Sequence, residues 1–136
     1  MAVTKVSSTT HFFQRKAANE AVTGRWTPNT DVYVAESTLI IKAELAGMKS
    51  DSLEIIVEGQ RLRINGVRPD CCRAPHCSFL VMEISYGPFE CVLDLPPGYD
   101  LSRARAVYMN GFLRIEVPQS HPSPNKATKV SIVQGA

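Results

Sequence analysis

The fold is decided by two short runs, Leu53-Glu54-Ile55-Ile56-Val57-Glu58 and Leu62-Arg63-Ile64-Asn65-Gly66-Val67, with Gly59 between them. In the first run Leu53, Ile55 and Val57 share one side of an extended chain, because successive side chains of a strand point to opposite faces. The run Leu113-Arg114-Ile115-Glu116-Val117 alternates in the same way, with its charged residues on the second face. A period of two predicts strands with one buried and one exposed face.

Similar runs, separated by turn residues, lie on both sides of these. The predicted strands are Asp31–Ala35, Thr38–Glu44, Leu53–Glu58, Leu62–Val67, Phe79–Ser85, Phe89–Leu95, Arg103–Met109 and Leu113–Val117. This spacing is typical of a β-sandwich. No amphipathic helical segment longer than about two turns interrupts the runs, which argues against a parallel α/β fold. The predicted fold class is all-β, an immunoglobulin-like antiparallel β-sandwich.

The two ends of the chain differ from this central part. Residues 1–25 are polar and poor in β-formers, so we expect a flexible N-terminal arm with at most marginal helix. Residues 119–136 begin with a Ser- and Pro-rich linker and then carry one apolar island, Val130-Ser131-Ile132-Val133. An apolar island on an extended tail cannot bury itself locally, which indicates a docking peptide. The predicted domain therefore covers residues 26–118.

Composition limits the classes of function. Of the 136 residues, 44% are hydrophobic and 21% charged, a globular balance. A net charge of +2 without a run of five basic residues argues against a dedicated nucleic-acid binder. The N-terminus lacks the apolar core of a secretory signal, and no apolar run reaches the roughly 18 residues that span a bilayer. We therefore expect a cytoplasmic protein without a membrane span.

Six motifs occur in a fixed order between residues 26 and 132. They are Trp26-Thr27-Pro28-Asn29-Thr30-Asp31-Val32, Glu44-Leu45-Ala46-Gly47-Met48, the paired runs 53–59 and 62–66, Glu83-Ile84-Ser85-Tyr86-Gly87-Pro88-Phe89, Asn110-Gly111-Phe112-Leu113-Arg114-Ile115-Glu116-Val117-Pro118, and Val130-Ser131-Ile132. Each motif is weak alone, but in this order they resemble the α-crystallin domain of bacterial small heat-shock proteins.

The resemblance implies an ATP-independent holding chaperone that needs no cofactor. It implies that the sandwich forms a homodimer, that dimers assemble into a larger homo-oligomer through their tails, and that unfolding client proteins are the partners. Val130 and Ile132 are then the docking anchors, because residues two apart in an extended segment point the same way. By the same analogy, the receiving groove is lined by Leu53, Ile55, Val57, Ala104 and Ala106. Which of these face the groove and which the core stays open.

The chain departs from the family pattern at two places. Cys91 stands where family members usually carry Arg, which removes any inter-subunit salt bridge assigned to that position. The loop Arg68–Ser78, usually rich in Glu and Lys, holds three cysteines and two prolines here. Its length suits the family's swapped strand, in which the loop pairs with the partner subunit. Pro69 and Pro75 limit how much of it can pair.

The loop cysteines Cys71, Cys72 and Cys77 lie near His76 and allow three interpretations. Zinc sites prefer two close Cys pairs, whereas Cys72 and Cys77 form one loose pair, so we expect no metal. A redox role across a dimer interface is the second interpretation, and ordinary loop thiols in a reducing cytosol are the third and the favoured one. The fourth cysteine, Cys91, lies in a strand pattern and is expected to be a small buried hydrophobe.

Aromatic residues outside the strands have two interpretations. Phe12, Phe13 and Trp26 are candidates for client binding, since exposed aromatics on a mobile arm can cover many unfolded surfaces. Oligomer packing is the alternative, and for Trp26, beside the first strand, packing at the sandwich edge is favoured.

Two rival classes of function stay open at this stage. A thiol- or metal-dependent enzyme is disfavoured, because no nucleophile, metal or phosphate-loop motif is present in the sequence. A monomeric co-chaperone module of the related CS-domain type would lack the tail motif and the large assembly.

Overall fold

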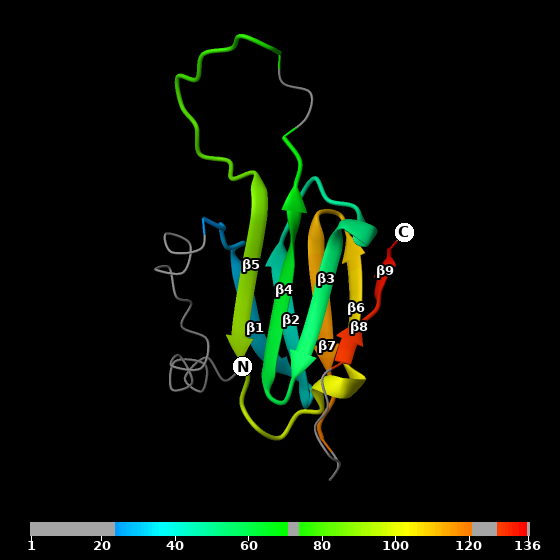
Figure 1. The fold of residues 1–136 in the computed structure, drawn as a ribbon. Helices are drawn as coiled ribbons and strands as arrows, with labels where there is room; N and C mark the ends of the chain where they lie inside the picture. The colour runs from blue at the N-terminus through cyan, green and yellow to red at the C-terminus, as the bar shows by residue number, and fades with distance from the viewer. Residues whose placement is uncertain (1–23, 71–73, 121–127, 136) are drawn as a thin grey trace.

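The computed structural model describes residues 24–70, 74–120 and 128–135. In this part of the chain, nine strands and two short 3-10 turns follow one another (Figure 1). The elements are β1 (Thr30–Ala35), β2 (Thr38–Glu44), η1 (Ser50–Ser52), β3 (Leu53–Glu58), β4 (Arg61–Arg68), β5 (Gly87–Asp94), η2 (Leu101–Arg103), β6 (Arg105–Met109), β7 (Phe112–Val117), β8 (Thr128–Val130) and β9 (Ile132–Gln134).

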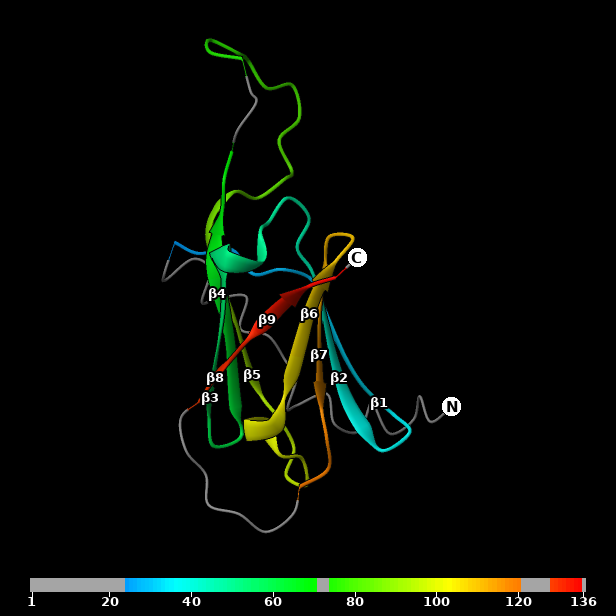
Figure 2. The ribbon, with the colours of Figure 1, turned by 90° about the vertical axis from the view of Figure 1, so that its right-hand side faces the viewer.

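The strands form two sheets that pack face to face (Figures 1 and 2). One sheet has the order β1-β2-β7-β6-β9 and the other β5-β4-β3-β8. Neighbouring strands are antiparallel except for β6 and β9, which pair in parallel. The predicted fold class, an antiparallel β-sandwich, is confirmed.

The core lies between the sheets and follows from alternation along the strands. In β3 and β7 every second residue is buried, and the residues between them face outward. The largest fully buried side chains are Phe89, Leu39, Ile41, Leu45, Ile55, Leu62, Ile64, Leu93, Leu113, Ile115, Val57 and Val117. Burying such side chains stabilises the fold by about 1.5–3 kcal/mol each relative to leaving them exposed.

Gly66, inside β4, is required by a close approach of backbone and side chain. A Cβ atom there would lie 2.5 Å from the carbonyl oxygen of Ser52 and 2.9 Å from the ring of Phe89. Glycine therefore lets η1 and β5 close over this end of β4.

Most strand boundaries lie close to the predicted ones. β2 and β3 have the predicted bounds, and β1, β4, β5 and β7 differ from them by one or two residues. The strand expected at Arg103–Met109 begins later, at Arg105, because the preceding residues form η2. The carboxylate of Asp100 accepts a hydrogen bond from the backbone N–H of Ser102 at 3.1 Å and caps that turn.

The prediction of a strand at Phe79–Ser85 is wrong. This segment has no regular structure and protrudes beyond the end of the sandwich, between β4 and β5 (Figure 1). Leu80 is 98% exposed and Val81 72%. An apolar run becomes a strand only where a sheet edge pairs with it, and no strand in the described part of the chain pairs with this run.

Candidate functional site: a groove that holds the C-terminal tail

The C-terminal tail lies across one open side of the sandwich. β8 pairs antiparallel with β3 at the edge of one sheet, and β9 pairs parallel with β6 at the edge of the other. Figure 2 shows the tail, in red, crossing from one sheet to the other. We call the channel between β3 and β6 the docking groove.

The register places both predicted anchors over the groove. Val130 lies opposite Ile55, and Ile132 lies opposite Ala106. Both anchor side chains are half-buried and pack against the core, whereas Val133 is 61% exposed. The alternation of an extended segment thus turns Val130 and Ile132 inward and their neighbours outward.

The residues predicted to line the groove lie in the core. Ile55, Val57 and Ala106 are almost fully buried, Leu53 is 8% exposed, and Ala104 is partly buried against the same cluster. Facing the core and lining the groove are therefore compatible roles for these residues. Their side chains face the interior, and the tail covers them where the two sheets do not close.

Contacts beyond the anchors extend the docked segment toward its end. The backbone N–H of Gly135 donates to the carbonyl of Tyr108 at 2.8 Å, and the Gln134 side chain donates to the same oxygen at 3.3 Å. A Cβ at position 135 would lie 2.7 Å from the Cβ of Met109, so a larger residue there would force a shift. These contacts were missed by the sequence analysis, since a Gln-Gly pair at a chain end has no distinctive pattern.

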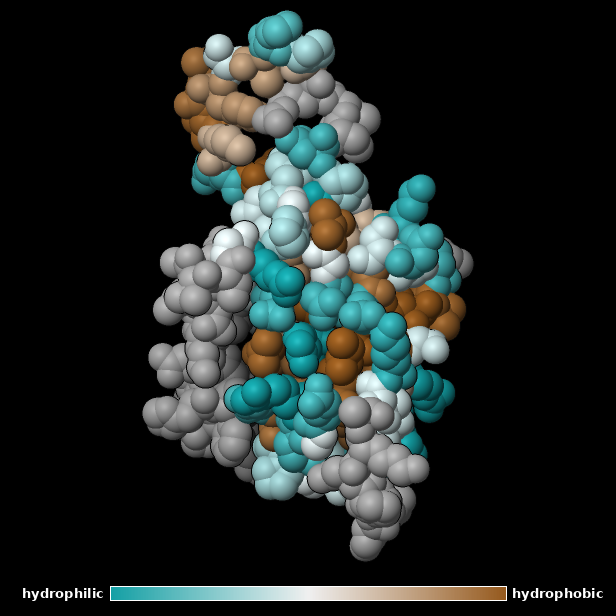
Figure 3. All heavy atoms as spheres, viewed as in Figure 1, coloured by the Kyte–Doolittle hydropathy of each residue, from teal (hydrophilic) through white to brown (hydrophobic). Residues whose placement is uncertain are grey.

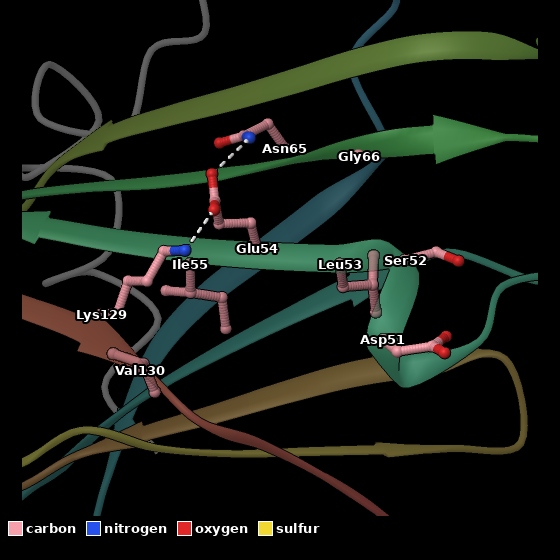
Figure 4. A pocket seen from close by; sticks show the side chains of 9 residues that line it. All are labelled: Asp51, Ser52, Leu53, Glu54, Ile55, Asn65, Gly66, Lys129 and Val130. Carbon is pink, nitrogen blue, oxygen red and sulfur yellow. Dashed lines mark hydrogen bonds and ion pairs between the residues drawn. The ribbon is translucent and has the colours of Figure 1, made fainter.

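A polar cluster lies on the outer face of the sheet beside Val130, formed by Glu54, Asn65 and Lys129 (Figure 4). The Lys129 Nζ lies 2.7 Å from Oε2 of Glu54, and Asn65 donates to Oε1 at 3.2 Å. Hydrogen bonds from Lys129 and then Asn65 hold the pKa of the Glu54 carboxyl below its ordinary value. An open cavity of about 400 Å³ runs between this cluster and η1.

A second surface with exposed apolar side chains is the protruding loop. Its exposed residues include Phe79, Leu80, Val81, Met82 and Ile84. In Figure 3 the brown, hydrophobic atoms at the end of the molecule belong to this part of the chain. Monomeric proteins seldom expose so many neighbouring apolar residues without a partner.

Arg68 holds the base of this loop. Its guanidinium donates to the carbonyl of Ser85 through Nε at 2.9 Å and through Nη2 at 2.6 Å. The same group stacks 4.3 Å above the Trp26 ring, which packs on Phe89 with ring centroids 5.1 Å apart. Trp26 is only 9% exposed, so of its two interpretations the structure supports packing at the sandwich edge.

The two cysteines that the structure describes lie in different environments. Cys77 is exposed on the protruding loop, whereas Cys91 is buried in the core with its Sγ 3.7 Å from the Thr30 hydroxyl, as expected of a small hydrophobe. Cys71, Cys72, Phe12 and Phe13 lie outside the described residues, as does the proposed N-terminal arm up to residue 23.

Among residues that the structure does describe, no three His, Cys, Asp or Glu side chains form a cluster suited to a metal ion. No helix in the same part of the chain is long and apolar enough to cross a membrane.

Comparison with known families gives one match over most of the chain. The model of the Hsp20/alpha crystallin family matches residues 31–133. Small heat shock protein C4 of Rickettsia felis is 27% identical over 104 residues, which cover 76% of this chain and 64% of that protein. Spore protein SP21 of Stigmatella aurantiaca is 29% identical over 102 residues, covering 75% and 60% respectively. The chain thus matches less than two thirds of the length of these two relatives.

Solved structures agree with the fold. The hspA protein of Xanthomonas axonopodis has a TM-score of 0.64 and 26% identity, and the match covers 70% of this chain and 95% of that one. A small heat-shock protein of Xylella fastidiosa has a TM-score of 0.63 at 24% identity, covering 75% and 94%. The similarity to the Xylella fastidiosa protein supports only the sandwich fold.

Proposed function

The chain belongs to the Hsp20/alpha crystallin family, and from this premise we propose that it is an ATP-independent holding chaperone, not an enzyme. It binds unfolding proteins in the cytoplasm and keeps them from aggregating under heat or other stress.

The observation that carries this proposal is the tail seated between β3 and β6. The groove holds an extended peptide by main-chain pairing on both sides and by two small apolar contacts. Main-chain pairing supplies affinity with little dependence on sequence, and side-chain contacts supply the selectivity. A surface of this kind suits exposed apolar segments of many unfolded proteins, and holding them requires no nucleotide.

The same groove and tail support a proposal for assembly. Every copy of the chain carries both parts, so a tail can occupy the groove of a neighbour with the pairing seen within one chain. A tail with two half-buried anchors binds weakly alone, and several tails acting together make a stable but exchangeable assembly. We propose that homodimers, formed through the protruding loop, assemble in this way, with the domain at residues 26–118 as the building block.

Clients then have two routes to the protein. The groove becomes accessible when a tail leaves it, and the arm carries Phe12 and Phe13 as additional candidate contacts. Reversible tail release therefore couples assembly to client binding.

A heat-aggregation assay tests the proposed function. The purified protein, without ATP, should reduce the turbidity of a thermolabile client at equimolar protomer, whereas an equal mass of an inert globular protein should not. Client turbidity that is unchanged at every temperature below the protein's own unfolding contradicts the chaperone proposal. Light scattering on the same sample separates it from a co-chaperone sandwich, which would remain a monomer.

A further inference from the structure

The tail and the strand it pairs with carry opposite charges. Residues 119–136 contain Lys126 and Lys129 but no Asp or Glu. Residues 50–58, which form η1 and β3, contain the three acids Asp51, Glu54 and Glu58 and no Lys or Arg. The β3 edge, which receives β8, thus carries the acids, and the tail is basic. Of these acids Glu58 is already paired with Arg63 of β4 at 3.3 Å, which leaves Glu54 for the tail.

The structure brings one acid and one base of this set into direct contact. In the pairing register Glu54 lies directly opposite Asn65 on one side and diagonal to Lys129 on the other. Its two carboxylate oxygens are divided between them: Oε2 pairs with Lys129 at 2.7 Å and Oε1 accepts from Asn65 at 3.2 Å (Figure 4). Asn65 therefore orients the carboxylate toward the tail, next to the Val130 anchor.

We propose that the Glu54–Lys129 pair is a specificity determinant of assembly: it makes the groove accept the basic tail of a second copy of this chain and reject a tail with an acid before the first anchor. The inference rests on the proposed tail-mediated assembly and adds to it the chemistry by which a tail is selected.

The free energy of this ion pair is too small to drive docking of the tail, but it is large enough to discriminate between tails. Lys129 is 72% exposed and Glu54 39%, and an ion pair this open strengthens one docking event by only about two- to five-fold. Two like charges at the same position weaken docking by a similar factor, so matched and mismatched tails differ by about ten-fold. Because an assembly uses several tails, the discrimination multiplies from one docking event to the next.

Charge exchange between copies tests the proposal. Glu54→Lys places a base beside Lys129, and Lys129→Glu places an acid beside Glu54, so each variant alone should need about ten-fold more protein for half-assembly in sedimentation velocity. In an equimolar mixture each groove meets a complementary tail on the other variant, while pairing within one chain stays mismatched. The mixture should therefore regain the parent's size. Raising the salt from about 0.1 M to about 1 M should reduce the differences between parent and variants.

Asp94→Lys is the matched control. Asp94 also makes an exposed 2.7 Å ion pair, with Arg61, but on β4 and β5, away from the tail. This variant changes the net charge by the same amount and sign as Glu54→Lys and should assemble like the parent. The proposal is overturned if Glu54→Lys and Lys129→Glu behave like Asp94→Lys. It is also overturned if the mixture stays small while the double variant Glu54→Lys/Lys129→Glu, which carries both changes in one chain, recovers the parent's size, since selection would then act only within a chain.

A separate variant tests whether tails link the subunits at all. Val130→Gly/Ile132→Gly removes both anchors, so its reduced size shows that tails link subunits whatever the charge variants do. If that variant keeps the parent's size, tail-mediated assembly is contradicted and the charge inference is overturned with it.

Discussion

At the scale of single residues, Tyr108 connects the docking groove to the rest of the sandwich. Its hydroxyl donates to the carbonyl of Leu45 at 2.7 Å and accepts from the N–H of Met48 at 3.1 Å. Its own backbone carbonyl receives the hydrogen bond from Gly135. One buried side chain thus holds the loop after β2 against β6, the strand that pairs with the tail.

Tyr108→Phe should therefore destabilise the domain. The substitution keeps the ring but leaves the Leu45 carbonyl and the Met48 N–H without this partner, which costs about 1–3 kcal/mol of unfolding free energy. Urea unfolding at a fixed protomer concentration measures the change. Tyr33→Phe is the matched control: its hydroxyl is exposed and accepts one long contact from Arg114 at 3.5 Å, so its effect should stay within about 0.5 kcal/mol. Equal midpoints for both variants would contradict the role given to Tyr108.

The roles of Tyr108 and Glu54 could not be predicted from the sequence, for different reasons. The hydroxyl of Tyr108 contacts residues about 60 positions away, a distance that alternation along one strand does not reveal. Glu54 looks like any outward-facing acid of β3, and its importance depends on the register between β3 and β8. A pattern along one strand predicts which face a side chain occupies, but not its neighbour across the sheet.

At the scale of elements, the protruding loop shows where patterns along the chain mislead. The run Phe79–Ile84, apolar except for Glu83, resembles a strand, yet no strand forms because no sheet edge pairs with it. β2 and β3 were predicted with their observed bounds, and each is paired on both sides by other strands. Among the residues that the structure describes, Arg68 holds the base of the loop through the carbonyl of Ser85. An apolar segment fixed in this way is suited to pair with the partner subunit in the proposed dimer.

Oxidation tests whether this loop meets its counterpart. Mild oxidation should produce a covalent dimer on non-reducing gels, because the loop carries Cys71, Cys72 and the exposed Cys77. Changing these three residues to Ser should abolish that dimer. Cys91→Ala is the control and should leave the yield unchanged, since the Cys91 thiol is buried. Only monomer after oxidation, or a dimer that survives loss of all three loop thiols, would count against a crossing loop.

At the scale of the whole molecule, the tail completes a sandwich that is open along one side. The spacing of Val130 and Ile132 predicted that their side chains share one face, and in the structure these residues lie over both sheets, opposite Ile55 in one and Ala106 in the other. The crossing from one sheet edge to the other was not predicted, because an isolated tripeptide gives no information on the strands beside it. Since the groove is lined by core residues, occupation by a tail also shields the core from water.

Removing the anchors should separate assembly from folding. In Val130→Gly/Ile132→Gly the tail loses the side chains that face the groove, while the core strands keep all of theirs. The variant should retain the β-type circular dichroism of the parent but sediment as dimers or smaller species, because the remaining main-chain pairing does not offset the cost of ordering the tail, about 1–2 kcal/mol per residue.

Glycine also makes the free tail more flexible, so the comparison needs a control with the same number of glycines. Ser131→Gly/Val133→Gly provides it, since both replaced side chains point away from the groove and Val133 is largely exposed. This control should lose little of the parent's size. If the two double variants shrink equally, flexibility and not anchor burial governs assembly. If neither shrinks, subunits are linked by another part of the chain, and the arm before Trp26 becomes the segment to truncate next.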